Sequence, residues 1–151
     1  MIFVVGILTI LSALPGGWLG DRLGRRLLIA ISGGIAFLGT LVLLSTTLIP
    51  NMPLVYVAGS IIGIASGLFV TINWAMGTDL APRQEAGRYL GVSNLAGAGA
   101  GMIGTGIGGP IADWINTSYP GLGYLAIFAC YGLLFVVSSI SLIGVKKVAS
   151  N

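Results

Sequence analysis

The sequence predicts an all-α polytopic membrane protein with five transmembrane helices. Charged residues make up only 7% of the 151 residues, whereas hydrophobic residues make up 56% and the mean hydropathy is +1.02. A globular protein usually carries about 25% charged residues, so this chain has too few to cover a water-exposed surface. The apolar residues fall in five long runs, and the seven basic residues lie at the ends of these runs. We therefore expect lipid to surround most of the chain.

Five segments are apolar enough to cross the bilayer as helices, which takes about 20 residues each. None of them contains Asp, Glu, Lys or Arg in its interior. The first is the shortest. We expect a single transmembrane domain over residues 1–151, with helices at about 2–18, 27–49, 54–76, 90–112 and 121–145.

The basic residues predict the orientation of these helices. If the five helices alternate across the membrane, every Lys and Arg falls on the same side: Arg22, Arg25, Arg26, Arg83, Arg88, Lys146 and Lys147. Cytoplasmic connections carry the excess of Lys and Arg in membrane proteins. We therefore expect a multi-pass protein of the plasma membrane, with the N-terminus outside and the C-terminus in the cytoplasm.

The 25 glycines form patterns that predict close helix packing. The third segment has glycine at every fourth position, and the fourth segment has a similar series. Lipid tails are as apolar as leucine, so membrane helices associate through close backbone approach at small residues. We expect these two ridges to pack against each other or against helices outside this chain. Their members are Gly59, Gly63 and Gly67 in the third segment, and Gly97, Gly101, Thr105 and Gly109 in the fourth.

The composition argues against several functional classes. The chain has no histidine, and its one cysteine, Cys130, lies in the middle of an apolar segment. We therefore expect no catalytic residues, no metal site and no cofactor. The basic residues gather at helix ends and form no exposed stripe, which argues against nucleic-acid binding. The partner that the composition predicts is the lipid bilayer.

The first connection carries the most specific motif of the chain. It reads Gly17-x-x-x-Asp21-Arg22-x-Gly24-Arg25-Arg26. This stretch resembles the signature loop of the major facilitator superfamily, G-x-x-x-D-[RK]-x-G-[RK]-[RK]. In that family the loop joins the second and third helices and recurs between the eighth and ninth.

Two weaker motifs resemble the same family. The run Asp79-x-x-Pro82-Arg83-x-Glu85-x-Gly87-Arg88 resembles the family's loop between helices ten and eleven, and Gly109-Pro110-x-x-Asp113 resembles the outer end of helix eleven. Five helices with an outside start and a cytoplasmic end fit only helices eight to twelve of a twelve-helix transporter. The resemblance therefore implies that the chain is a fragment and that its partner is an N-terminal part with the remaining helices.

The signature loop implies a conformational gate. Gly24 permits a tight chain reversal, and Asp21 is placed to face a helix N-terminus, where a carboxylate is favoured. In the family, a loop arginine also pairs with an acid that ends the next-but-one helix, which implies the pair Arg25 and Asp79. The expected gate residues are Gly17, Asp21, Arg22, Gly24, Arg25, Arg26 and Asp79. The alternative is that these charges only set the topology, and both roles can hold together.

A few polar residues lie inside the apolar segments. Helices eight, ten and eleven line the central cavity in the family, which makes the candidate cavity-lining residues Ser66, Thr71, Asn73, Trp74, Asn94 and Thr105. The alternative for each is a hydrogen bond between helices, which stabilises membrane proteins by about 0.6 kcal/mol. No ionisable residue lies within the membrane segments. A proton-coupling group, if the transporter has one, is therefore expected outside this chain.

The resemblance implies a secondary active transporter that moves a small solute by alternating access, without enzymatic activity. The sequence does not identify the small-molecule substrate. Two alternatives remain open from the residues alone. One is a small membrane scaffold that binds a partner through its glycine ridges. The other is a membrane-embedded enzyme, which the missing histidine and the lack of paired intramembrane acids disfavour.

Overall fold

The computed structural model describes residues 1–80 and 84–143, except the side chains of Leu80, Thr105, Leu142 and Ile143. It contains five helices and, within the described residues, no strand: α1 (Ile2–Leu23), α2 (Arg25–Ser45), α3 (Met52–Leu80), α4 (Ala86–Ser118) and α5 (Leu122–Ile143). The all-α prediction is confirmed. Arg83, Lys146 and Lys147, which contributed to the predicted orientation, lie outside the described residues, as does the side chain of Thr105.

The first connection is shorter than the sequence predicted. Helix α1 continues through the charged residues to Leu23, and only Gly24 separates it from α2. A helix satisfies its own backbone hydrogen bonds, so it continues into the headgroup region without cost in unpaired groups. Charged residues at that depth therefore mark the edge of the bilayer and not the end of the helix. Helices α3 and α4 exceed their predicted ranges for the same reason.

Helix α2 ends earlier than predicted, at Ser45. The hydroxyls of Ser45, Thr46 and Thr47 donate to the carbonyl oxygens three residues earlier, at 2.6–2.7 Å. Such side-chain bonds compete with the helical backbone pattern. Three in succession account for the turn that replaces the last predicted residues of this helix.

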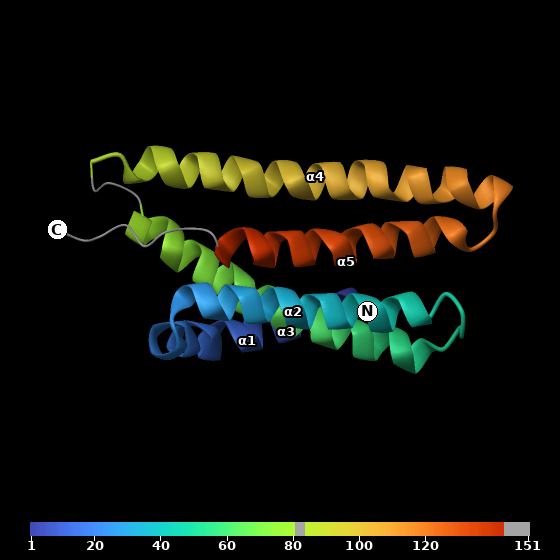
Figure 1. Cartoon of the computed structure of the whole chain (residues 1–151), viewed down its shortest axis with the longest axis horizontal. Coiled ribbons are helices and arrows are strands. Elements are labelled where there is room, and N and C mark those ends of the chain that lie inside the picture. The colour runs from blue at the N-terminus through green and yellow to red at the C-terminus, as the bar shows by residue number, and fades with distance from the viewer. Residues whose placement is uncertain (81–83, 144–151) are drawn as a thin grey trace.

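Helix α3 occupies the centre of the packing. It lies against α1 and α2, and α2 in turn lies against α5 (Figure 1). Helix α4 runs along α5 and contacts α3 less extensively. Near the start of α4, Leu90 approaches Gly77 of α3. The chain thus contains one packed group, α1, α2, α3 and α5, with α4 attached at its side.

Within the described residues, four helices are long and apolar enough to cross a membrane: α1, α2, α3 and α5. In the described part of the chain α4 does not reach the same hydropathy, because nine of its 33 residues are glycine. At a rise of 1.5 Å per residue it is about 50 Å long, so its length suffices to cross the bilayer.

The glycine ridge of α3 packs against α1. A Cβ atom built at Gly63 would lie 2.8 Å from the carbonyl oxygen of Val5, and one at Gly67 would collide with Ser12 and Thr9. The hydroxyl of Thr9 also donates to the carbonyl oxygen of Gly63, at 3.1 Å. The expectation that this ridge meets α4 or a helix outside the chain is therefore wrong, because α1 already covers it.

The glycine ridge of α4 has a different environment. Among the described residues, a Cβ atom built at Gly97, Gly101 or Gly109 would meet no atom within 4 Å. On a neighbouring face, Gly104 and Gly108 lie against the ring of Tyr131 from α5. The two ridges therefore do not pack against each other. Sequence spacing identified both ridges, but it carries no information about which helix faces each one.

The two ridges predict opposite outcomes for the same substitution. Gly67→Ala should destabilise the chain by about 1–3 kcal/mol, because the added methyl group overpacks the contact with α1. Gly97→Ala adds the same methyl group to open space and should leave stability unchanged or raise it, because alanine favours helix by about 1 kcal/mol. Thermal melts of both variants in detergent measure the difference. Equal melting temperatures would mean that α1 does not pack on the α3 ridge.

Candidate functional site

The candidate site lies where α1 ends and α2 begins. Gly24 has φ = 90°, a conformation that other residues rarely adopt. Its N–H donates to the carbonyl oxygen of Gly20, and its own carbonyl oxygen accepts from Leu28. A single glycine therefore closes one helix and opens the next, which places the side chains of Asp21 and Arg25 within reach of each other.

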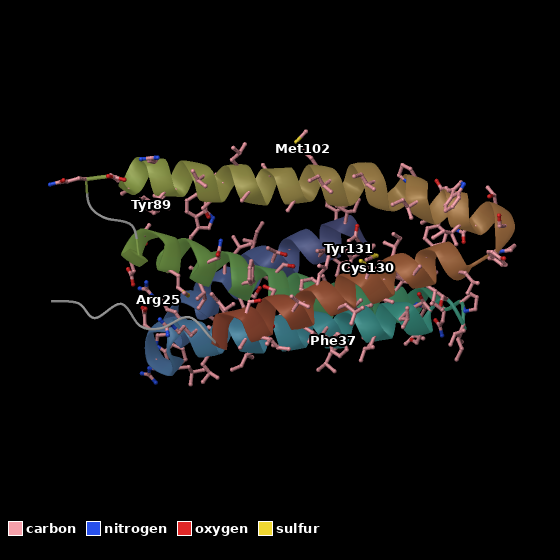
Figure 2. The ribbon with its side chains drawn as sticks, turned by 45° about the horizontal axis from the view of Figure 1, so that its top comes forward. Arg25, Phe37, Tyr89, Met102, Cys130 and Tyr131 are labelled. Carbon is pink, nitrogen blue, oxygen red and sulfur yellow. The ribbon has the colours of Figure 1, made fainter. Side chains whose placement is uncertain are left out.

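Arg25 joins the ends of three helices (Figure 2). Its guanidinium donates to the carboxylate of Asp79 and to the carbonyl oxygen of Ala75, the latter at 2.7 Å, near the end of α3. It also lies 3.6 Å from the carboxylate of Asp21 at the end of α1. The side chain is 30% exposed, whereas those of Asp79 and Asp21 are 62% and 73% exposed. The structure thus places Arg25 against Asp79, the acid that the family resemblance implied, and also near Asp21.

The helix dipoles explain why this pairing is favourable. Arg25 is the first residue of α2, and Asp79 lies in the last turn of α3. A cation at a helix N-terminus and an anion at a C-terminus are each unfavourable within their own helix. When α2 and α3 meet, Arg25 lies at the negative end of α3 and Asp79 at the positive end of α2. Each charge therefore stabilises the end of the other's helix.

An apolar cluster packs next to the charged residues. Leu28, Ile29 and Ile72 are at most 3% exposed, and Leu19 and Met76 pack against them. Gly20 of α1 contributes to this packing, because a Cβ atom there would collide with Ile72. The packing of this cluster holds the ends of the three helices together and so keeps Arg25 close to Asp79.

The other expected gate residues surround this centre. Arg22 stacks over the ring of Trp18, with 4.2 Å between the guanidinium carbon and the ring centroid. Arg26 borders the same cavity as Arg25 and Asp79. A Cβ atom built at Gly17 would lie 3.7 Å from the methyl group of Thr71, so Gly17 contributes to the contact between α1 and α3 and not to the charged cluster.

The candidate cavity-lining residues do not gather in one place. Asn73 and Trp74 are exposed on α3, and Asn94 is exposed on α4. Thr71 instead lies at the contact with α1 and donates its hydroxyl to the carbonyl oxygen of Gly67. Ser66 borders a cavity of about 110 Å³ between α2, α3 and α5. The described residues contain no group of three or more His, Cys, Asp or Glu side chains that could hold a metal ion.

Two contacts between α4 and α5 were not anticipated from the sequence. The hydroxyl of Tyr131 donates to the carbonyl oxygen of Gly104 at 2.9 Å, and the N–H of Gly123 donates to the side chain of Asn116 at 2.9 Å (Figure 2 labels Tyr131). The spacing of Gly104 and Gly108 by four residues was the available signal for the first contact. Neither contact belongs to the charged cluster.

Comparison with known proteins agrees with the family resemblance of the motif at Gly17 to Arg26. The family model of the Major Facilitator Superfamily matches residues 1–148. The chain is 29% identical over 92 residues to the "Minor myo-inositol transporter IolF" of Bacillus subtilis, a match that covers 61% of this chain and 20% of the relative. It is 30% identical over 105 residues to the "Myo-inositol transporter 3C" of Cryptococcus neoformans var. grubii, covering 70% of this chain and 17% of the relative.

These matches cover about a fifth of the length of each relative. Four of the five helices have the length and composition of membrane spans, as expected for a multi-pass membrane protein. The match to the family model extends over nearly the whole sequence and includes the charged cluster around Arg25. The chain belongs to the Major Facilitator Superfamily.

Proposed function

We propose that this chain forms the C-terminal part of a secondary active transporter that moves a small solute by alternating access. In this proposal α1 to α5 correspond to helices eight to twelve of a twelve-helix protein. An N-terminal part would supply the remaining helices and cover the glycine ridge of α4, where Cβ atoms built at Gly97 and Gly109 would meet no described atom within 4 Å. The protein would lie in the plasma membrane with its charged cluster on the cytoplasmic side.

The observation that carries the proposal is the position of Arg25 between the ends of α1 and α3. In alternating access, contacts on one side of the membrane must form and break as the two halves rock. A half-exposed ion pair is suited to this, because it contributes about 1 kcal/mol or less. A difference of that size changes the ratio of two conformations about fivefold, since about 1.4 kcal/mol corresponds to tenfold.

Within the proposed gate the remaining residues have supporting roles. Gly24 sets the reversal between α1 and α2, and Gly17 keeps α1 close to α3. Arg22 and Arg26 add positive charge on the cytoplasmic side. The proposed gate is therefore Gly17, Asp21, Arg22, Gly24, Arg25, Arg26 and Asp79.

For the substrate we propose an uncharged polyol. Both relatives bear the name of myo-inositol transporters. The apolar segments of this chain contain no ionisable carboxylate or amine that would bind a charged solute. A polyol needs hydrogen-bonding side chains instead, and the exposed Asn73, Trp74 and Asn94 are the first candidates for contact. Ser66, Thr71 and Thr105 complete the proposed lining set.

Charge reversal tests the pairing of Arg25. Arg25→Asp would bring three carboxylates together, and Asp79→Arg would place two guanidiniums side by side. Each single variant should therefore melt about 2–4 °C lower, the shift that corresponds to about 1 kcal/mol in a domain of this size. The double variant should recover only part of this loss, because Asp21 would then face an acid at position 25.

The matched control is reversal of the exposed pair Glu85 and Arg88, whose side chains are 54% and 81% exposed and 3.8 Å apart. Reversing either residue there should change the melting temperature little. If the double reversal of Arg25 and Asp79 melts no higher than the less stable single variant, the two residues do not stabilise each other.

Uptake of radiolabelled myo-inositol tests the proposed activity. The transporter that contains this segment should take up the label in proteoliposomes, and excess unlabelled myo-inositol, but not succinate, should compete. Asp21→Asn should lower the initial rate about fivefold or more without loss of reconstituted protein, because one contact of Arg25 weakens. Glu85→Gln is the control and should retain the rate. Normal uptake by Asp21→Asn would remove Asp21 from the gate, and competition by succinate would contradict an uncharged substrate.

A further inference from the structure

Helix α4 differs from the other helices in how well it suits the membrane. Of the five helices in the described residues, it alone falls short of the hydropathy of a membrane span, although it is long enough to cross. Nine of its 33 residues are glycine, and a glycine adds no apolar side chain to the helix surface. Transfer of apolar side chains out of water is what drives a helix into the bilayer. Alone, α4 is therefore only weakly driven to insert.

Helix α5 has the opposite composition. It contains no Asp, Glu, Lys or Arg, and it has the length and hydropathy of a membrane span. Only residues 119–121 separate it from α4, and Gly121 makes the reversal with φ = 86°. Helices joined by so short a connection lie antiparallel as a hairpin, and Figure 1 shows α4 and α5 side by side. The strongly apolar helix thus lies next to the weakly apolar one.

Close contacts join the two helices from their middle to their connection. The hydroxyl of Tyr131 donates to the carbonyl oxygen of Gly104 at 2.9 Å, and a Cβ atom built at Gly108 would lie 2.7 Å from the same hydroxyl oxygen. Nearer the connection, the side chain of Asn116 accepts from the N–H of Gly123 at 2.9 Å. A Cβ atom built at Gly123 would also collide with the backbone of α4. Small residues on both helices therefore permit a close approach, which two hydrogen bonds stabilise.

The other helices give α4 little support. It contacts α3 less extensively than α5, and Leu90 near its start lies 3.5 Å from a Cβ atom built at Gly77. Among the residues that the structure describes, neither α1 nor α2 packs against it. Cβ atoms built at Gly97 and Gly99 would meet no described atom within 4 Å. Within this chain, α5 is therefore the helix that can hold α4 in the bilayer.

We propose that α4 depends on α5 to cross the membrane: the two helices enter and stay in the bilayer as one hairpin, and α4 does not cross alone. Helix α5 supplies the apolar surface, and the contacts of Tyr131 and Asn116 hold α4 against it. Basic residues lie before α4 and after α5 in the sequence, whereas the connection between them has none, which favours both free ends of the hairpin on one side. The hairpin allows α4 to keep an open glycine face for another helix. This dependence involves neither the transported solute nor the charged cluster, so it holds or fails independently of the proposed function.

Thiol labelling of the whole 151-residue chain tests the proposal. Single cysteines are placed in a Cys130→Ser background and probed with a membrane-impermeant maleimide before and after permeabilisation. Because α3 and α4 both cross in the unaltered chain, Asn51→Cys and Ser118→Cys should react from one side and Gln84→Cys from the other. The comparison does not depend on which side is the cytoplasm.

Three arginines in α5 provide the test variant: Leu133→Arg, Val137→Arg and Ile140→Arg. These side chains are 64%, 58% and 61% exposed. They lie about 180–240° around the helix from Tyr131, so the substitutions leave the face toward α4 unchanged. Arginine inside the hydrocarbon is costly, so α5 should no longer stay in the bilayer. Ser118→Cys should then change sides and react like Gln84→Cys.

Two further variants separate apolar surface from packing. Alanine at the same three positions shortens the side chains without adding charge, and Ser118→Cys should stay on its original side. Gly97→Leu and Gly99→Leu, added to the arginine variant, give α4 apolar surface in open space and should return Ser118→Cys to that side. If Ser118→Cys keeps its original side in the arginine variant without these leucines, α4 crosses alone and the proposal is wrong. A change of side in the alanine variant, or no return with the leucines, would also overturn it, because apolar surface would then not decide the crossing.

Discussion

Close approach of α1 to α3 is the contact on which the rest of this structure depends. In lipid, apolar side chains gain little by meeting each other, so helices pack where small residues let their backbones come near. Gly63 and Gly67 provide such a surface on α3, and Thr9 of α1 adds a hydrogen bond to it. At the other end of the same interface, Gly16 and Gly20 of α1 admit Leu68 and Ile72. The two helices are thus held together along their length.

That contact positions the charged cluster. Because α3 is fixed against α1 and α2, its last turn brings Asp79 to the start of α2, where Arg25 lies. The ion pair between Arg25 and Asp79 contributes little energy. Without it, however, each charge would lie at the unfavourable end of its own helix dipole. The apolar cluster around Leu28 and Ile72 keeps the helices packed, while the weak contact between Arg25 and Asp79 can break and form again.

Much of the fold could be predicted from the sequence, for identifiable reasons. Long apolar runs predict helices because the bilayer accepts few other structures. The resemblance of the loop around Gly24 to the family's signature loop implied that Arg25 would meet Asp79. Prediction failed at two helix ends, because hydropathy alone does not decide where a helix ends. Charges at Asp21 and Arg22 looked like a loop, although a helix can continue into the headgroups. The turn after Ser45 depends on three hydroxyls that bond to the backbone, which hydropathy does not record.

The partners of the glycine ridges could not be predicted, because periodicity describes one helix and packing involves two. Spacing marked Gly63 and Gly97 equally, yet α1 covers the first, and a Cβ atom at the second would meet no atom of the described residues within 4 Å. For the candidate lining residues too, the sequence did not show which side of the helix faces another helix. Thr71 faces α1, whereas Asn73, two residues later, is exposed. A rotation of about 200° separates such neighbours on a helix of 3.6 residues per turn.

A disulfide between α1 and α3 tests the central contact most directly. A Cβ atom built at Gly16 lies 3.8 Å from the Cβ atom of Thr71, which is close to the average for a disulfide. In a Cys130→Ser background, Gly16→Cys with Thr71→Cys should oxidise rapidly within one chain, so that maleimide labels almost no free thiol. Gly97→Cys with Thr71→Cys should keep both thiols under the same conditions. If the first pair stays as reactive as the second, α1 does not lie against α3 and the account of the fold is wrong.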